Sequence, residues 1–554
     1  MRSHRSLCLM WLLLFLVSGQ LLQVPSSRAQ DARGTAPAQG EPAAGPGAAA
    51  SEALPLFDIL GFEIDGSTLL HVDKVKEAVK DFVGSGKTVQ DVEKARDALE
   101  KYYHDVGYPT VLVNIPEQMV EGGVIRLEVI ESRIGRVKVT GNRYYTMEHI
   151  LGSLPSLKPG EIIHGPSVQE DITRLNRNLD IKVKPSLSPG RDPGTVDVEL
   201  VVEDRRPIHG GVEINNRSTH DTTELRLNAS VSYDNLWQRQ HSVSFQYQSA
   251  PLDTSEVQVF AGSYALPAPW NKDHHMVLYG VWSDSDTAFG EGFRTVGKGS
   301  IVGGRYIMPL PPYKAYGHSL NIGFDYKDFE EVQGFSNPSE PGVNSPVTYF
   351  PLSVSYSASL RDPLGTTFFS GGLNMVFRGL VTDQGEFEEK RFKARGNYLY
   401  GTFGVERTQT LPGHMALFLK ADGQIADQPL INNEQFAAGG MESVRGYRET
   451  EVLGDWGIHA TVELHGPDIT RWSDLAKDKW VCVPFLFYDF ASLRILEPLP
   501  EQNAFFELQG AGFGVRGSLF KRVEYNTSVG FAFLDTERTE AGDSLFHFQV
   551  KYTF

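Results

Sequence analysis

Few side chains in this sequence have the types and spacing that catalysis or cofactor binding requires. The stretch Gly512-Phe513-Gly514-Val515-Arg516-Gly517 matches the GxGxxG pattern, but dinucleotide binding needs a strand before these glycines and a helix after them. Alternating segments typical of strands surround it, so we interpret the glycines as places where a strand bends or another segment packs closely. The histidines include no HExxH pair, and Cys482 is the one cysteine beyond the N-terminal leader. We predict no catalytic site, no metal site and no cofactor.

Two other stretches could supply an ion pair. The long connection 436–457 carries Arg445 among flexible glycines, and Asp489 interrupts the apolar and aromatic run FLFYDFASL. Neighbouring side chains of a strand point to opposite faces, so Phe487, Asp489 and Ala491 would share one face of that strand. A lone carboxylate on the inner wall of a barrel invites a cationic partner. Composition alone, however, predicts that the connection is a loop whose charges are solvated.

Residues 208–554 consist of many short segments that alternate between apolar and polar side chains. The polar positions are mostly Ser, Gln, Asn, Gly and Thr, and Tyr, Phe or Trp often stand near the ends of the segments. A soluble sheet would fill a core with its apolar face, whereas a membrane barrel needs a lipid-facing band, aromatic girdles and a polar interior. We predict a membrane all-β barrel, in which this length holds roughly sixteen antiparallel strands at about 22 residues per strand and connection. The pattern runs to the C-terminus in Phe546, Phe548, Val550, Tyr552 and Phe554.

Residues 56–207 differ, because strand and helix periods follow one another there. In 56–133 a strand ending at Asp65-Gly66 precedes two segments of helical period, and the strands TVLVNI and GVIRLEVIES follow,. The order strand, helix, helix, strand, strand returns in 134–207. The sequence therefore predicts two copies of one α+β unit in series.

The N-terminus has the pattern of a secretory signal. Basic residues precede the apolar run LCLMWLLLFLV, and Ser27 and Ala29 place small residues at the −3 and −1 positions of a cleavage site,. We predict a signal peptide over 1–29 and an Ala/Gly/Pro-rich linker over 30–55. The formal net charge of −17 argues against a nucleic-acid partner,.

The order of these parts, together with several short motifs, resembles the outer-membrane transporters of two-partner secretion. This is the TpsB class, which includes ShlB- and FhaC-like haemolysin and haemagglutinin secretion proteins, within the outer-membrane insertase superfamily. Residues 107–142 and 187–204 are similar to the POTRA domains of that family, so the resemblance implies two α+β POTRA domains before the barrel. The terminal Phe554 resembles the signal that the barrel-assembly machinery reads.

Two motifs of the family bear on the possible ion pair. Val444-Arg445-Gly446-Tyr447 resembles the VRGY loop motif, and Phe487, Asp489 and Ala491 resemble the FxDxG motif of the barrel wall, with Ala491 in place of the glycine. The resemblance implies that the loop folds into the lumen and that Arg445 pairs with Asp489. A pair that lines a wet lumen would contribute about 1–3 kcal/mol.

The resemblance also implies location and partners. The protein would lie in the outer membrane of a Gram-negative bacterium, among its lipids, with the POTRA domains in the periplasm. Its partner would be a large secreted exoprotein, adhesin- or haemolysin-like and β-helical, exported without ATP as it folds outside the cell. The exoprotein would add a strand to the sheet edge of the first POTRA domain at Thr110, Val111, Leu112 and Val113.

Two other interpretations remain open at this point. An assembly factor that inserts barrels into the outer membrane shares the loop motif and the C-terminal barrel, although that branch usually has more POTRA units. A passive porin or an enzyme barrel would leave the two periplasmic units and the arginine loop unexplained. Family members often carry an N-terminal plug helix, which the tract of residues 30–55 does not clearly provide.

Overall fold

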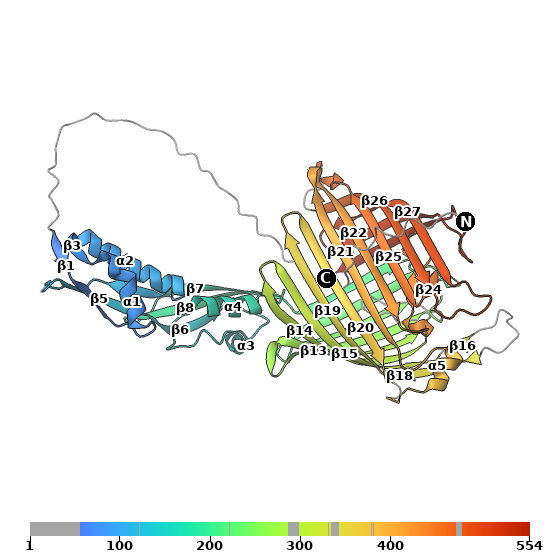
Figure 1. Ribbon diagram of the computed structural model, residues 1–554, viewed down its shortest axis with the longest axis horizontal. Helices are drawn as coiled ribbons and strands as arrows, with labels where there is room; N and C mark the ends of the chain where they lie inside the picture. The colour runs from blue at the N-terminus through green and yellow to red at the C-terminus, as the bar shows by residue number, and fades with distance from the viewer. Residues whose placement is uncertain are drawn as a thin grey trace, which may run out of the picture. The chain divides into compact units, whose positions relative to one another are not determined.

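The computed structural model describes residues 56–554 apart from 121, 221, 286–297, 331, 334–342, 378, 381 and 473–478. The described residues form two compact units, 56–207 and 208–554 (Figure 1). The predicted signal peptide (1–29) and linker (30–55) lie outside the described residues. In the part of the chain that is described, no helix has the length and apolar character needed to cross a membrane.

The first α+β unit packs two helices on a three-stranded sheet of order β2-β5-β4. Strand β2 is parallel and β4 antiparallel to β5. In the longer helix Val92, Ala95, Leu99 and Tyr103 are buried, and this spacing of three or four residues gives one apolar stripe,. The elements are β1 (Phe57–Ile59), β2 (Gly61–Asp65), α1 (Val72–Val79), β3 (Gly84–Lys87), α2 (Val89–Val106), β4 (Val111–Asn114) and β5 (Val124–Glu131), with β1 and β3 paired as a separate small sheet.

The second unit repeats this arrangement. Its sheet has the order β6-β8-β7, with β6 parallel and β7 antiparallel to β8. The order of elements and the strand directions match those of the first unit, so the fold contains the internal repeat that the sequence predicts. The elements are β6 (Arg133–Thr140), α3 (Met147–Gly152), α4 (Gly165–Leu175), β7 (Ile181–Pro189) and β8 (Thr195–Asp204).

Each unit uses a glycine to turn the chain after the strand that precedes its first helix, β2 or β6. Gly66 has a φ of 79° and Gly141 a φ of 88°, in the left-handed region that favours glycine,. A Cβ atom at Gly66 would collide with the main-chain oxygen of Val129, and one at Gly141 with that of Val202. The first turn therefore passes directly over the last strand in both units.

A carboxylate at the end of the last strand then holds the residues that follow the turn. Glu131 accepts hydrogen bonds from the backbone N–H groups of Thr68 (2.7 Å) and Leu69 (2.9 Å). Asp204 accepts from three backbone N–H groups, those of Arg143, Tyr144 and Tyr145. The two acids occupy equivalent positions in the repeat and perform the same structural task.

We expect Glu131→Ala and Asp204→Ala each to destabilise the unit that contains the substitution by about 1–3 kcal/mol, because backbone donors lose a charged acceptor. The measurement is urea unfolding of the fragment 56–207. Glu93→Ala is the matched control, since Glu93 is exposed on α2. Equal midpoints for all three variants and the unsubstituted fragment would contradict this account of the repeat.

Residues 208–554 form a closed antiparallel barrel in which the last strand pairs with the first. It has sixteen strands in the wall, because β18 and β19 continue one another and both pair with β15. The strands are β9 (Ile208–Asn215), β10 (Arg226–Leu236), β11 (His241–Ser249), β12 (Gln258–Ala268), β13 (Asn271–Asp284), β14 (Gly299–Tyr313), β15 (Tyr316–Phe329), β18 (Val347–Tyr349), β19 (Pro351–Asp362), β20 (Gly365–Val376), β21 (Leu399–Leu411), β22 (Met415–Ala426), β25 (Trp456–His465), β26 (Trp480–Arg494), β27 (Phe505–Leu519), β28 (Val523–Ala532) and β29 (Ser544–Thr553).

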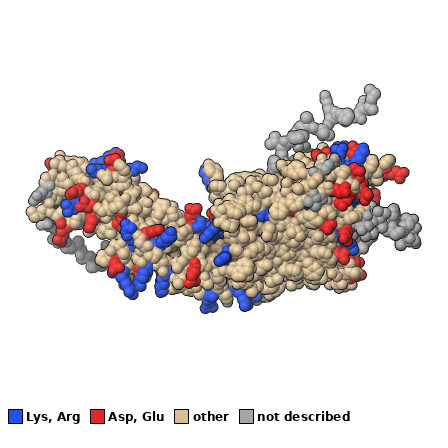
Figure 2. All heavy atoms as spheres, turned by 90° about the horizontal axis from the view of Figure 1, so that it is seen from below, with Lys and Arg blue, Asp and Glu red and all other residues tan. Residues whose placement is uncertain are grey.

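The wall has an apolar outer face and a polar inner face. In β29, Phe546 is 53% exposed and Tyr552 41% exposed, whereas His547 between them is 2% exposed. Figure 2 shows a broad band of the barrel surface with almost no charged side chains, and acidic and basic residues gathered at one end. The predicted membrane barrel of about sixteen strands is confirmed.

Shorter elements lie in the connections of the barrel. The helix α5 (Gln384–Lys390) follows β20, and β16 (Val332–Gln333) pairs with β17 (Val343–Asn344). In the connection between β22 and β25, β23 (Phe436–Ala438) pairs with β24 (Val452–Gly454).

Candidate functional site

The connection 427–455 between β22 and β25 contains many buried residues, and we call it the lumen loop. Val444 and Tyr447 are fully buried and Arg445 is 4% exposed. Val444 and Tyr447 pack in one apolar cluster with Ala491 and Leu493 of the wall strand β26. The loop is therefore held against the wall, and the interpretation of its charges as solvated is wrong at Arg445.

The Arg445 side chain reaches two carboxylates on the wall. Its Nε and Nη2 atoms donate to the two oxygens of Asp489, over 2.7 and 2.8 Å, and its backbone N–H donates to the same group over 3.1 Å. Its Nη1 donates to Glu463 on β25 over 2.6 Å. The guanidinium carbon lies 3.5 Å from the centre of the Phe487 ring, in reach of a cation–π contact.

This pair is buried, whereas a pair in a wet lumen was expected. Asp489 has no exposed surface and Glu463 is 4% exposed. Removal of one member of a buried, hydrogen-bonded pair costs about 3–5 kcal/mol, because it leaves an unpaired charge. The contribution of about 1–3 kcal/mol that the sequence analysis expects for the pair therefore applies to an ion pair that is more exposed than this one.

The other motif residues fit the loop to the wall. Gly446 has a φ of 106°, and a Cβ atom there would lie 2.8 Å from the nitrogen of Ala532. The Tyr447 hydroxyl donates to the carbonyl oxygen of Leu534 over 2.9 Å, and burial raises the pKa of this hydroxyl, which keeps its proton. Ala491 is fully buried against the loop, so the methyl group that replaces the family's glycine is accommodated.

Glycines of β27 and β28 make room for the loop and for two aromatic rings. A Cβ atom at Gly530 would lie 2.5 Å from the nitrogen of Gly446, and one at Gly510 would collide with the carbonyl oxygen of Arg445. Gly512 and Gly514, the first glycines of the GxGxxG match, lie under the rings of Phe487 and Phe485. The match is thus part of a strand, and its glycines allow close packing, as the sequence predicted.

The sequence did not single out Glu463, which contacts three side chains with donor nitrogens. Besides Arg445, it accepts hydrogen bonds from Arg516 Nη2 and from His465 Nε2, each over 2.7 Å. A signal was present in β25, where His459, Thr461, Glu463 and His465 occupy alternate positions. Four polar residues on one face of a membrane strand indicate a face that points into the lumen.

Two further carboxylates anchor the loop near its ends. Glu434 accepts hydrogen bonds from Lys327 (2.6 Å) and from the hydroxyl groups of Tyr349 (2.6 Å) and Tyr400 (2.7 Å), all on the wall. Asp455, which is fully buried, accepts from both terminal nitrogens of Arg391 and from the backbone N–H of Leu430 (2.8 Å) and Leu496 (2.6 Å). Arg391 follows α5, so Asp455 joins three connections of the barrel.

Additional pairs fix the middle of the loop. Arg217, in the connection after β9, donates to Glu442 over 2.9 Å and to Glu449 over 3.2 Å. The positive charge of Arg217 lowers the pKa of the Glu442 carboxyl. The loop is thus fastened along most of its length, with Arg445 as its most deeply paired residue.

Comparisons with known proteins give this arrangement a family. Residues 57–132 match the domain described as POTRA domain, ShlB-type, and residues 352–517 match the domain described as haemolysin secretion/activation protein ShlB/FhaC/HecB. The chain is an outer-membrane transporter of this ShlB/FhaC class. It therefore resides in the outer membrane, with its POTRA region in the periplasm.

Similar proteins include transporters from two bacteria. The chain is 23% identical over 427 residues to the outer membrane transporter CdiB of Dickeya dadantii (strain 3937), which covers 74% of this chain and 72% of that protein. It is 25% identical over 430 residues to the outer membrane transporter CdiB of Escherichia coli O6:K15:H31 (strain 536 / UPEC), with coverage of 74% and 69%.

Solved structures show the same fold. CdiB from Escherichia coli superimposes with a TM-score of 0.64 at 18% identity, over 92% of each chain. BamA from Haemophilus ducreyi lacking POTRA domains 1–3 superimposes with a TM-score of 0.54 at 15% identity, over 90% of this chain and all of that one. This chain therefore shares its fold both with CdiB and with BamA.

The predicted docking strand of the transporter lies at an edge whose outward groups are already bonded. Val111 and Val113 of β4 are buried, Leu112 is 52% exposed, and Thr110 precedes the strand in a turn. The N–H of Val113 donates to Glu100 Oε2 over 3.0 Å, and Nε2 of His104 lies 3.0 Å from the carbonyl oxygen of Val111. A new strand would have to displace these two side chains of α2.

The C-terminus of the transporter closes the barrel. Strand β29 pairs with β9 over five residue pairs, and Phe554 extends the ladder through hydrogen bonds with Gly210. A Cβ atom at Gly210 would lie 2.5 Å from the Phe554 ring. Phe554, predicted as an assembly signal, therefore lies on the seam between the first and last strands.

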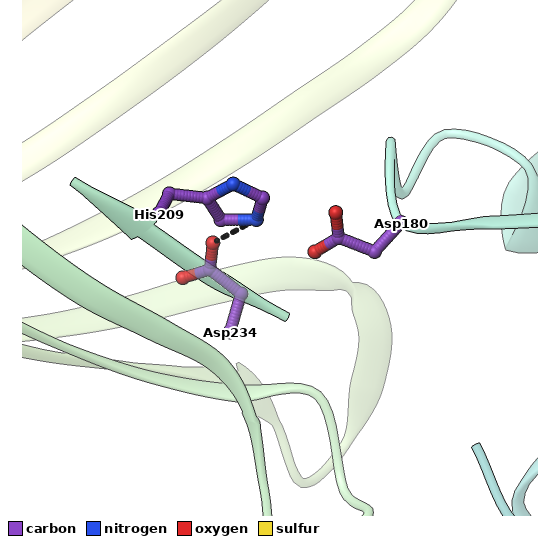
Figure 3. Close-up of side chains that lie close together, drawn as sticks. All are labelled: Asp180, His209 and Asp234. Carbon is purple, nitrogen blue, oxygen red and sulfur yellow. Dashed lines mark ion pairs between the residues drawn. The ribbon is translucent and has the colours of Figure 1, made fainter. Parts of the chain in front are cut away.

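A histidine and an aspartate lie close together near the start of the barrel. His209 Nε2 is 3.4 Å from Asp234 Oδ2, as the dashed line in Figure 3 marks. The third side chain drawn, Asp180, belongs to the unit 56–207, where it accepts a hydrogen bond from Arg205 over 2.6 Å. One imidazole and one carboxylate supply two ligands, whereas zinc takes four, so the His209–Asp234 pair does not by itself assign a metal.

We expect Gly530→Ala to lift the lumen loop from the wall while the barrel still assembles. The added methyl group would occupy the space of the Gly446 nitrogen. The measurement is trypsin cleavage after Arg445 or Arg448 in intact cells, which should accelerate by about tenfold or more, the equivalent of 1.4 kcal/mol.

Gly262→Ala is the matched control for this substitution. A Cβ atom at Gly262 would meet nothing nearer than 3.8 Å, so cleavage should stay at the rate of the unsubstituted protein. Slow cleavage of an assembled Gly530→Ala barrel would show that the loop is not held by close contact with β28.

Proposed function

We propose that this transporter exports one large secreted protein through its barrel and that the lumen loop is the latch that keeps the barrel in its resting state. The family implies a secreted exoprotein as partner. The observation that carries the latch proposal is the buried contact of Arg445 with Asp489 and Glu463. The exoprotein is β-helical and adhesin- or haemolysin-like, and its folding outside the cell drives export without ATP.

The electrostatics of the contact support a latch. When Arg445 is in place, the charges of two wall carboxylates are balanced, since Arg516 also contacts Glu463. When the loop leaves, Asp489 and Glu463 must be hydrated or find other cations, which costs several kcal/mol in a buried site. An exported chain that admits water, or brings its own cations, lowers that cost and thereby promotes opening.

We expect cells without this protein to lose one large protein from the culture medium, while the outer membrane keeps its other barrels. Arg445→Ala should reproduce that loss although its own barrel is assembled, because the latch cannot return to its resting position. The measurement is comparative proteomics of medium and outer membrane, with heat-modified gel mobility as the test of assembly.

Controls separate the latch from the alternative function. Arg448→Ala removes a nearby arginine of the same loop that pairs with the exposed Glu224, and it should leave most secretion intact, since exposed pairs contribute about 0–1 kcal/mol. A broad fall in outer-membrane barrels with no missing secreted protein would identify an insertion factor instead. Normal secretion by an assembled Arg445→Ala protein would contradict the latch.

We also propose that the exoprotein adds a strand to β4 of the first POTRA domain. The edge of β4 offers main-chain groups at Val111 and Val113 beside the exposed side chain of Leu112. Glu100 and His104 bond to these groups in the resting state. They would compete with the incoming strand and limit binding to chains that can supply several hydrogen bonds together.

We expect two substitutions at this edge to act in opposite directions. Glu100→Ala frees the N–H of Val113 and should tighten binding of the exoprotein by about fivefold, the effect of one hydrogen bond near 1 kcal/mol. Val113→Pro removes that N–H and should weaken binding. The measurement is the affinity of the purified exoprotein N-terminal region for the fragment 56–207.

Glu93→Ala, on the exposed side of the same helix, is the control and should not change the affinity. If all three variants bind with equal affinity, the exoprotein docks elsewhere.

As a further part of this proposal, the barrel-assembly machinery recognises Phe554 before the seam with β9 has closed.

A further inference from the structure

The inner face of the barrel, which is polar along most of its length, is apolar near the outer ends of β13 and β14. Strand β9 begins where the periplasmic POTRA region ends, so β13 runs outward and β14 runs back toward the periplasm. Val281 of β13 and its cross-strand partner Ile301 of β14 are 4% and 5% exposed. The next residue of each strand, Trp282 or Val302, is exposed on the lipid side. The inner face of a membrane barrel is ordinarily polar, so these buried apolar side chains require a covering segment inside the lumen.

The covering comes from the connection between β20 and β21 and from the start of the lumen loop. Phe387 of α5 and Ile431 of the loop are fully buried. Both belong to one apolar cluster with the wall residues Val281 and Ile301. The Phe387 ring meets the ring of Tyr349 on β18 edge-on, with 5.5 Å between the ring centres, and Figure 1 shows α5 beside β18. We call these five side chains the outer cluster.

The lumen loop continues from the outer cluster to the opposite wall. Counted from β9, β18 and β19 together form the eighth strand of the ring and β29 is the sixteenth, so the two lie on opposite sides. Glu434 of the loop accepts a hydrogen bond from the Tyr349 hydroxyl on β18 over 2.6 Å. The backbone N–H of Gly446 donates to Nε2 of His547 on β29 over 3.4 Å. The loop therefore crosses the lumen from wall to wall.

Hydrogen bonds fasten α5 to the loop and to the wall. Arg391, the residue after α5, donates to both carboxylate oxygens of Asp455 at the end of the loop. It also donates to the carbonyl oxygen of Leu430 at the start of the loop. On the wall side, Glu386 of α5 accepts a hydrogen bond from the backbone N–H of Thr348 on β18 over 2.8 Å. α5 and both ends of the loop are thus joined in one arrangement.

We propose that the outer cluster is a seal, which closes the outer mouth of the barrel to ions and small polar solutes until an exported chain displaces it. An apolar constriction excludes water from a pore, and an ion that enters it must give up its hydration. The Arg445 contact holds the loop in place, whereas Phe387 and Ile431 make the closure tight. This inference rests on the proposed export of a protein through the barrel.

The chemistry of the seal also selects what can open it. A polypeptide carries apolar side chains, which can replace Phe387 and Ile431 against Val281 and Ile301 without exposing these wall residues to water. A hydrated ion or a small polar solute has nothing that could replace them. The wall residues of the outer cluster are therefore an interaction surface for apolar side chains of the exported chain.

The test is the potassium chloride current through the purified full-length transporter in planar lipid bilayers. We expect Phe387→Ala to raise the current of the resting channel by about tenfold or more, because loss of the ring leaves a gap in the apolar layer. Phe392→Ala is the matched control, since Phe392 belongs to the same connection but is exposed. It should leave the current unchanged.

Ile431→Ala tests the loop side of the seal and should raise the resting current as well. Neither Phe387 nor Ile431 belongs to a wall strand, so we expect both variants to assemble, and gel mobility before and after heating verifies this. Resting currents equal to wild type in both assembled variants would overturn the inference. A current that rises equally in Phe392→Ala would also overturn it, because the leak would then not arise from the outer cluster.

Secretion separates this inference from the proposed function. If Phe387→Ala and Ile431→Ala conduct as wild type while Arg445→Ala abolishes secretion, the seal is wrong and the export function stands. If both variants leak but loss of the transporter removes no protein from the medium, the closure is right. Its release by an exported chain is then wrong, together with the proposed export.

Discussion

Two carboxylates buried on the inner wall, Asp489 and Glu463, set the constraint around which the rest of the lumen is arranged. A membrane barrel must pair all of its backbone groups within the wall, so its polar side chains point inward and can meet only one another, water or a segment that enters the lumen. Burial of two such charges requires cations at hydrogen-bond distance. Arg445 supplies the largest share, and the lumen loop must enter the barrel to bring it there.

The shape of the wall follows from the same requirement. A backbone that carries an arginine to Asp489 needs space close to β27 and β28, and this space exists because Gly510 and Gly530 lack side chains. The ring of Phe487 lies over Gly512 and under the guanidinium group of Arg445, and the ring of Phe485 lies over Gly514 and under the guanidinium group of Arg516. Glycine, aromatic ring and arginine thus form stacked layers, and the GxGxxG match marks the bottom layer.

Local pattern predicted the parts of this protein that depend on periodicity. The alternation from Phe546 to Phe554 predicted a lipid-facing strand, and the repeated strand and helix order predicted two units with one topology. The role of Glu463 could not be predicted in this way, because it depends on which strands become neighbours when the ring closes and on where the loop enters. The docking edge shows the same limit: the alternation of Val111 and Val113 predicts a strand, but the helix side chains that bond to it, Glu100 and His104, come into contact only when α2 packs on the sheet.

The ion pairs along the lumen loop differ in which partner carries the positive charge, the loop or the segment that it contacts. This difference determines the register in which the loop can lie against the wall. At the deepest pair the loop provides the cation, Arg445, and the wall provides the acids. Elsewhere the loop provides acids, Glu442 in its middle and Glu434 and Asp455 near its ends, and the cations come from other segments, Arg217, Lys327 and Arg391. A loop that slipped along the wall would bring its own acids toward Asp489 and its arginine toward Lys327, and like charges at such distances are repelled. The pairs therefore specify one register of the loop on the wall.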